Sequence, residues 1–167
     1  SAEDAINIIK SKFKIDNIKI ENSLSDAIDI DFSEGYIKKI EINHAGGDGI
    51  DFSGSYSSID KAIVSNVKDK ALSIGEKTNL NLNFLEIKKN NIGVATKDES
   101  HVVINNVSSN SNLIDFMVFN KKKIYSEAYM EIKNSNLYNY LLDDENILIV
   151  NQKKLKNTKF NLEDHYD

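Results

Sequence analysis

The chain has 167 residues, 40% of them hydrophobic, with 21 lysines and no arginine against 26 acidic residues, for a formal net charge of −5. This length suits one domain with a core, and an acidic chain without arginine is a poor candidate for nucleic-acid binding, which depends on clustered cations and the arginine fork. The absence of cysteine excludes disulfides and thiolate metal sites, and no apolar run approaches the roughly 20 residues that span a bilayer.

Six segments, taken in chain order, repeat one pattern at a step of 22 residues. The first five open with Ala or Gly and the sixth with Asp, and in each of the first four the next apolar residues stand two positions apart. The segments are AINIIKS from Ala5, AIDIDFS from Ala27, GIDFSGS from Gly49, ALSIGEK from Ala71, GVATKDE from Gly93 and DFMVFNK from Asp115.

A second motif, apolar-x-x-apolar-x-apolar, recurs with the same 22-residue period. Alternation of period two predicts strands, because a helix needs spacings of three and four sustained over ten or more residues. The stretch AEDAINIIKSKF reads alone as an amphipathic helix, but its alignment with the later segments makes it a strand. The motif positions are Ile15, Ile18 and Ile20; Ile37, Ile40 and Ile42; Ile59, Ala62 and Val64; after a one-residue insertion Leu82, Leu85 and Ile87; then Ile104 and Val107; and finally Ile132 and Leu137.

These repeats predict an all-β fold, a right-handed parallel β-helix of six to seven coils. Leucine-rich repeats have a similar length, but their asparagine-anchored leucine signature is missing, and a sandwich has strands every 8–12 residues without a fixed small-then-apolar row. We expect a single domain over 1–167, with regular coils over about 5–120, an insertion at about 121–127, a last coil with a strand-pair cap over about 128–156 and a polar tail over 157–167.

The segments DAIDIDFSEG, GDGIDFSGS, DKALSIGE and NIGVATKDES resemble coils of bacterial right-handed parallel β-helix proteins, the pectate-lyase-like superfold. They are most similar to modules found beside spore-coat-kinase-like domains in bacterial surface proteins. The resemblance runs from about Ala5 to Lys156, and LLDDENILIVNQKKL is similar to the strand pair that ends such modules. It implies an extracellular or cell-surface location and a longer protein with an N-terminal domain. It implies no single activity, since this superfold hosts lyases, hydrolases, epimerases, adhesins and inert spacers.

Strand alternation places an acidic patch on the outer face of two neighbouring coils, which stack about 4.8 Å apart. The patch comprises Asp26, Asp29, Asp31, Asp48 and Asp51, with Glu76 one coil further and Lys97 about two coils away. Stacked carboxylates repel, and a shared cation relieves the repulsion. Asp26, Asp29, Asp48 and Asp51 are therefore candidate ligands for Ca²⁺, which prefers oxygen. The alternative is that Asp26 and Asp48 cap turns while the other aspartates face water.

The resemblance to lyases implies a mechanism in which a cation site holds a uronate carboxylate and a basic residue removes the adjacent proton. Asp29 and Asp51 are then the candidate catalytic acids, with Lys97 or Lys70 as the base. The arginine base, the Asp-Pro-His signature of epimerases and the Gly-His-Gly and Arg-Ile-Lys signatures of polygalacturonases are all missing.

The candidate substrate-binding residues are Asp31, His44, Glu76 and Phe119. His44 lies in the turn before the coil of Asp48, and Phe119 is an outward-facing aromatic residue of the kind on which sugars stack. We expect His101 and His165 to be solvated, and the aromatic residues of the last third to form a cap.

Two function classes remain open. The sequence favours a non-catalytic module of a secreted or surface protein that presents its acidic face to a glycan or a protein partner, with Ca²⁺ as its candidate cofactor. The alternative is a polysaccharide lyase or epimerase that uses Asp29, Asp51 and Lys97.

Overall fold

The computed structural model describes residues 4–135, 139–159 and 161, and within them the chain forms fifteen strands and no helix. Seven strands form one sheet, sheet A, in the order β1 (Ile6–Ile9), β3 (Ile28–Asp31), β5 (Ile50–Ser53), β7 (Lys70–Gly75), β9 (Ile92–Lys97), β11 (Ile114–Phe119) and β13 (Tyr140–Leu142). Eight form sheet B, in the order β15 (Lys153–Lys154), β14 (Ile147–Val150), β12 (Tyr129–Asn134), β10 (His101–Asn110), β8 (Asn79–Lys88), β6 (Tyr56–Val67), β4 (Glu34–Ala45) and β2 (Lys12–Ser23).

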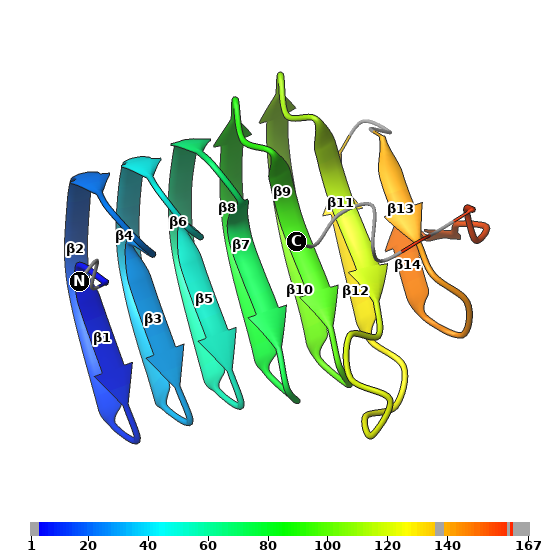
Figure 1. The fold of residues 1–167 in the computed structure, drawn as a ribbon, viewed down its shortest axis with the longest axis horizontal. Coiled ribbons are helices and arrows are strands. Elements are labelled where there is room, and N and C mark those ends of the chain that lie inside the picture. The colour runs from blue at the N-terminus through cyan, green and yellow to red at the C-terminus, as the bar shows by residue number, and fades with distance from the viewer. Residues whose placement is uncertain (1–3, 136–138, 160, 162–167) are drawn as a thin grey trace.

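The strands stack as a parallel β-solenoid of about six turns (Figure 1). Consecutive strands of each sheet are parallel and pair residues 22 apart in the first coils, as Ile6 does with Ile28 and Ile28 with Ile50. The predicted fold class is therefore confirmed, and the arrangement fits the right-handed winding that parallel crossovers adopt. The first repeat is a strand, not a helix, because β1 pairs along its whole length with β3.

The first five coils turn after their sheet-A strands at one or two residues in a left-handed backbone conformation. After the first three sheet-A strands these residues are Lys10, Phe32 and Gly54, with φ values of 48°, 48° and 58°. After β7 the turn uses two such residues, Glu76 and Lys77. This longer turn contains the insertion that the sequence places before Leu82.

A ladder of hydroxyl groups ties these turns together. Ser33 Oγ accepts the Ser11 N–H and Ser55 Oγ accepts the Ser33 N–H, both at 3.0 Å. Thr78 Oγ1 accepts the Ser55 N–H, and Ser100 Oγ accepts the Thr78 N–H, both at 3.2 Å. The ladder satisfies N–H groups at the turns, where sheet pairing is interrupted.

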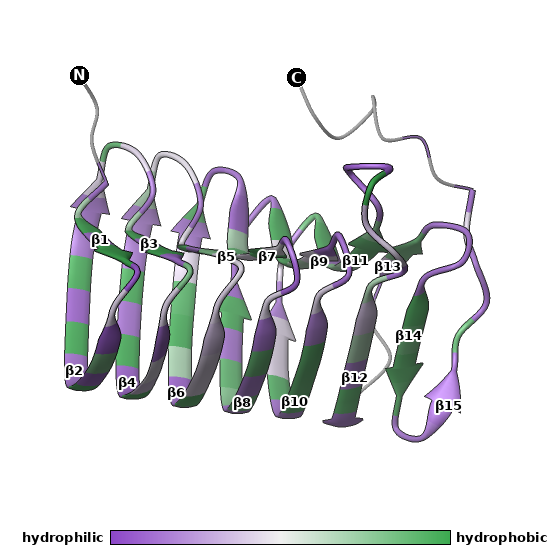
Figure 2. Ribbon diagram, turned by 90° about the horizontal axis from the view of Figure 1, so that it is seen from below, coloured by the Kyte–Doolittle hydropathy of each residue, from purple (hydrophilic) through white to green (hydrophobic). Residues whose placement is uncertain are grey.

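The core lies between the two sheets and consists of the inward residues of successive coils. In the ribbon of Figure 2, hydrophobic and hydrophilic positions alternate along β2 and β4 and recur at matching positions of the two strands. The small residue that opens each of the first five repeats is explained by the space beside it. A Cβ on Gly49 would lie 2.5 Å from the Ala71 carbonyl oxygen, and one on Gly93 would lie 2.5 Å from the Asp115 carbonyl oxygen and from Ile87 Cδ1. A larger residue at either position would overlap the adjoining coil.

The two ends of the solenoid differ. At the N-terminal end β1 and β2 are edge strands, and inward residues such as Ile15 and Ile18 are only half-buried. At the C-terminal end β15 pairs antiparallel with β14, which is the expected strand pair, and Thr158 N–H donates to Leu142 O at 3.0 Å. No helix in the described part of the chain is long and apolar enough to cross a membrane.

The predicted insertion is a loop, residues 120–128, between β11 and β12 (yellow in Figure 1). Buried Asp98 anchors it, since its Oδ1 accepts the N–H groups of Lys121 and Lys122 at 2.8 and 2.7 Å. Leu137 and His165, to which the sequence assigned a motif position and a solvated side chain, lie outside the described residues.

Candidate functional site

The acidic patch lies on the outer face of sheet A, on its first coils. The register joins Asn7, Asp29, Asp51 and Ser73 in one column, and it joins Asp31, Ser53 and Gly75 in the next. Both columns agree with the strand alternation of the sequence. Parallel strands without an offset place residues one repeat apart on neighbouring strands, about 4.8 Å from each other.

Three of the four predicted metal ligands come together. Asp26, Asp48 and Asp51 each offer a carboxylate oxygen, and these oxygens lie within 4.8 Å of one another. Asp29, the fourth predicted ligand, does not belong to this group among the described residues. Its charge nevertheless acts at the site, since Asp51 and Asp26 are among the neighbours that raise its pKa.

Asp26 and Asp48 also close the turns that enter β3 and β5. Asp26 Oδ1 accepts the Asp48 N–H at 2.6 Å, and Asp48 Oδ1 accepts the Lys70 N–H at 2.9 Å. Gly47 makes room for the first contact, because a Cβ there would lie 2.1 Å from Asp26 Oδ1. The turn-capping alternative is thus present in the structure, and it leaves the second oxygen of each carboxylate for another partner.

Burial makes ionisation of these carboxyl groups unfavourable. It raises the pKa of Asp29 to about 6, with further increases from the charges of Asp31 and Asp51. Burial also raises the pKa of Asp48 to about 6, although Lys70 opposes the shift. The pKa of Asp26 and that of Asp31 are raised as well, again mainly by burial. A site of this kind favours a bound cation or a bound proton.

Asp51 has one buried oxygen without a visible partner. Its Oδ1 is inaccessible to solvent and receives no hydrogen bond from any described residue. A buried carboxylate oxygen usually has a donor or a cation beside it. Asp51 is also the member of the cluster that projects from the strand itself, since it lies at the second position of β5.

Two lysines approach the acidic cluster from the following coils. Lys70, which is 3% exposed, places its Nζ 3.5 Å from Asp48 Oδ1 and also pairs with Asp69. Lys97 reaches back from β9 to donate a 2.8 Å hydrogen bond to Ser73 Oγ on β7. Its alkyl chain lies over Gly75, where a Cβ would be 2.7 Å from Lys97 Cε.

The sequence places Lys97 about two coils from the acidic patch, but its ammonium group reaches the strand that adjoins the strand of Asp51. Ser73 is the direct neighbour of Asp51 in the sheet. Burial lowers the pKa of Lys97, while the negative charges of Asp51 and Asp48 oppose that effect. Sequence reasoning missed Ser73 and Gly75 as partners of Lys97, although both lie in the outward columns that the repeat defines.

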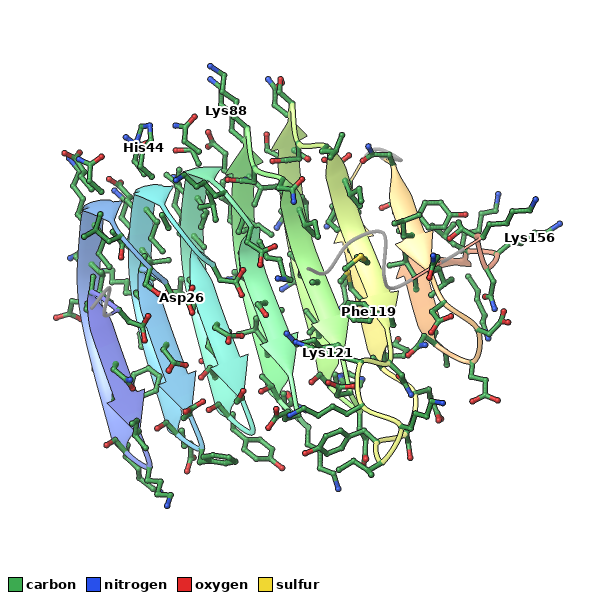
Figure 3. The ribbon with its side chains drawn as sticks, in the orientation of Figure 1. Asp26, His44, Lys88, Phe119, Lys121 and Lys156 are labelled. Atoms are coloured by element: carbon green, nitrogen blue, oxygen red, sulfur yellow. The ribbon has the colours of Figure 1, made fainter. Side chains whose placement is uncertain are left out.

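The other predicted binding residues lie around the site or away from it. Asp31 is half-buried beside the cluster, and Glu76 lies in the turn after β7, where it pairs with Lys122. The Glu76 charge raises the pKa of Asp31. His44 is exposed near the end of β4 and not in a turn, with a φ of 65°, and Figure 3 shows it at the edge of the solenoid, away from Asp26.

Phe119 corrects one expectation. It does face outward from sheet A, but it is fully buried in a second apolar cluster with Ile92, Ala95, Ile114 and Met117. A sugar ring cannot stack on a side chain with no exposed surface. The outer face of sheet A is therefore acidic over its first coils and apolar and covered over its later ones.

A comparison of the chain with protein-family models, with curated proteins and with solved structures found no match. The resemblance to pectate-lyase-like proteins is therefore supported only at the level of the parallel β-solenoid. A function can be inferred only from the geometry of the site.

Proposed function

We propose that the chain is a non-catalytic binding module of a secreted or surface protein, and that its acidic face binds an acidic glycan through a shared cation. The observation that carries the proposal is the convergence of Asp26, Asp48 and Asp51 within 4.8 Å, with Asp51 Oδ1 buried and unpaired. Carboxylate oxygens on a partly rigid frame suit Ca²⁺ better than softer metals. A bound Ca²⁺ would offset the repulsion among the carboxylates and offer its open positions to sugar oxygens.

Lys70 limits how strongly the cluster needs a metal. Its ammonium group already supplies one positive charge 3.5 Å from Asp48. The three carboxylates still carry an excess of negative charge over this one cation, and Asp29 and Asp31 add to it on the next positions of the same face. The cluster therefore retains the charge and the free oxygens that a divalent cation requires.

Thermal melting during a calcium titration tests the cation site. We expect Ca²⁺ to raise the melting temperature of the wild type and not that of Asp51→Asn, because ligand binding to the native state stabilises it. Asp16→Asn is the matched control, since Asp16 is an exposed aspartate on sheet B. Calcium that leaves the wild-type melt unchanged would remove the main support for the site.

Binding to immobilised acidic oligosaccharides, with Ca²⁺ and with EDTA, then tests the ligand. The proposal expects retention that requires Ca²⁺ and is lost in Asp51→Asn. If calcium stabilises the protein but no acidic glycan is retained, the cation site stands and a protein partner replaces the glycan.

A lyase or epimerase is the second candidate, favoured by the lowered pKa of Lys97 and its position beside the neighbour of Asp51. In a lyase, neutral Lys97 Nζ would remove the proton next to a uronate carboxylate, a C=C bond would form and the glycosidic oxygen would leave. The test is the ultraviolet absorbance of an unsaturated uronate product. Formation of that product by the wild type and its loss in Lys97→Met would place the enzyme ahead of the binding module.

A further inference from the structure

A second surface, on the outer side of sheet B, has the composition of a ligand site. Two adjoining hollows of about 500 and about 340 Å³ lie over the first halves of β2, β4 and β6, and they share Lys12, Glu34 and Tyr56. We call them together the aromatic groove. The volumes fall within the range of small-ligand pockets. None of the residues of the acidic cluster lines either hollow.

The aromatic residues of the first three coils gather in this groove. These coils contain five aromatic residues, of which Phe52 is in the core and Phe13, which is partly buried, packs against the core. Phe13 and Tyr36 line the larger hollow, Phe32 lines the smaller one, and Tyr56 lies in both. Phe32 is 57% exposed and Tyr56 is 63% exposed. Exposed rings contribute little to folding, so their concentration at one place points to a ligand.

The rings of Phe32 and Phe13 pack against glycines of the next coil. A Cβ on Gly54 would lie 2.6 Å from Phe32 Cδ1, and one on Gly35 would lie 2.5 Å from Phe13 Cγ. Phe32 also adopts a φ of 48°, which is unfavourable for a bulky residue and is used without penalty by Gly54 at the equivalent turn.

Hydrogen-bonding groups lie one coil beyond the rings. Tyr56 is paired in the sheet with Asn79, and the neighbouring column joins Tyr36, Ser58 and Asn81. These amides and hydroxyls are about one coil spacing, 4.8 Å, from the rings. Rings beside amide and hydroxyl groups match the apolar faces and hydroxyl edges of sugars.

The charge of the groove favours anionic over uncharged sugars. Lys12 pairs with Glu34 at 3.2 Å, whereas Lys10 and Lys14 form no ion pair with any described residue. The lining residues therefore carry an excess of positive charge on a protein that is negative overall, while the negative charges of Asp60, which accepts the Tyr36 hydroxyl, and of Asp16 act on the Tyr36 end of the groove. Complementary charge favours an anionic ligand.

We propose that the aromatic groove binds an anionic glycan chain independently of any cation. Its sugar rings lie against Tyr56 and Phe32, its hydroxyls meet Asn79 and Asn81, and its acidic groups lie beside the lysines at the rim. The site is separate from the acidic face of sheet A and does not depend on the function proposed for that face.

Isothermal titration calorimetry in EDTA with short β-linked oligoglucuronates tests the proposal, with glucose oligomers of the same linkage as the uncharged probe. We expect the oligoglucuronates to bind, Tyr56→Ala to lower the affinity at least about tenfold, and Lys14→Gln and added salt to weaken binding. Tyr129→Ala is the matched control, since Tyr129 lies in the same column as Tyr56 but outside both hollows.

Phe32→Gly separates binding from folding, because glycine adopts a φ of 48° without strain. We expect this variant to melt no lower than the wild type and to bind more weakly. Failure of the oligoglucuronates to bind in EDTA, equal affinity for the uncharged oligomers, or full affinity in Tyr56→Ala would each overturn the proposal. Asp51→Asn distinguishes the two sites, since it should abolish calcium-dependent retention and leave binding in EDTA intact.

Discussion

Replacing Asp48 with asparagine should stabilise the protein at neutral pH. Asp48 is 8% exposed, and burial raises its pKa from the ordinary value of 3.8 to about 6. The native state therefore binds a proton more tightly than the unfolded chain does, so stability falls as the pH rises from about 4 through about 6. One pH unit corresponds to about 1.4 kcal/mol, and the ionised Asp48 thus costs about 3 kcal/mol above pH 7.

Asparagine removes this cost and keeps the turn, because its Oδ1 can still accept the Lys70 N–H. Urea unfolding followed by circular dichroism in EDTA, near pH 4 and near pH 8, measures the difference. We expect Asp48→Asn to equal the wild type near pH 4 and to exceed it by up to about 3 kcal/mol near pH 8. Asp16→Asn, an exposed replacement, should show no such pH dependence.

Calcium should reverse the order. At a concentration one thousandfold above the dissociation constant, a cation bound only to the native state adds about 4.1 kcal/mol to the free energy of unfolding of the wild type, which exceeds the advantage of about 3 kcal/mol expected for the variant. Asp48→Asn lacks a ligand and should gain much less. A variant that is less stable than the wild type near pH 8 in EDTA would refute the reasoning, because it would show that ionised Asp48 is favourable in the fold without a metal.

Two further predictions concern the solenoid itself. Ser55→Ala should lower the free energy of unfolding by about 1–3 kcal/mol, because it leaves the buried Ser33 N–H without an acceptor. Ser55→Thr should retain stability, because Thr78 occupies the equivalent position one coil later. Equal urea midpoints for the two variants would contradict the role of the hydroxyl ladder. Gly93→Ala should lower the free energy of unfolding by about 1–3 kcal/mol or more, because the new Cβ would overlap the Asp115 carbonyl oxygen. An unchanged thermal melt would show that the coils can move apart.

The sequence predicted the coils because parallel stacking turns a sequence period into spatial neighbours. Residues 22 apart, such as Asp29 and Asp51, become direct partners in the sheet, so the period by itself defines the outward columns. The same logic identified the first segment as a strand, although its local pattern also suits a helix. Fold class and column membership thus follow from the repeat alone.

Burial on the outer face did not follow from the repeat. Period-two alternation tells which face a side chain points to, not what covers that face. Phe119 points outward as expected and is nevertheless fully buried. The signal that could have revealed this is the apolar character of both faces of β11, where Phe116, Met117, Val118 and Phe119 are consecutive, since a strand buried on both sides loses its alternation.

Long side chains extend beyond the columns that the repeat defines. The column position of Lys97 places its Cα two coils from Asp51, but the extended side chain reaches Ser73 on the intervening strand because Gly75 offers no side chain in its path. A column gives the position of a Cα, and a lysine can act several ångströms away from it. The exposed rings of the aromatic groove were missed for a related reason, since they lie in turns and on the second sheet, away from the acidic columns of the first.

The later turns of the solenoid show that aspartate is not needed to close a coil. There asparagine side chains accept the N–H groups of the preceding coil, with Asn90 Oδ1 bonded to Val67 N–H and Asn112 Oδ1 bonded to Asn90 N–H, both at 3.0 Å. An amide closes these turns without an ionisation cost, whereas Asp48, which accepts the N–H of the following coil, closes its turn with a raised pKa. If turn closure were its only role, asparagine would serve better at position 48. The fold carries an avoidable electrostatic cost at the place where Asp26 and Asp51 converge with Asp48, and a cation that binds these three carboxylates would recover it.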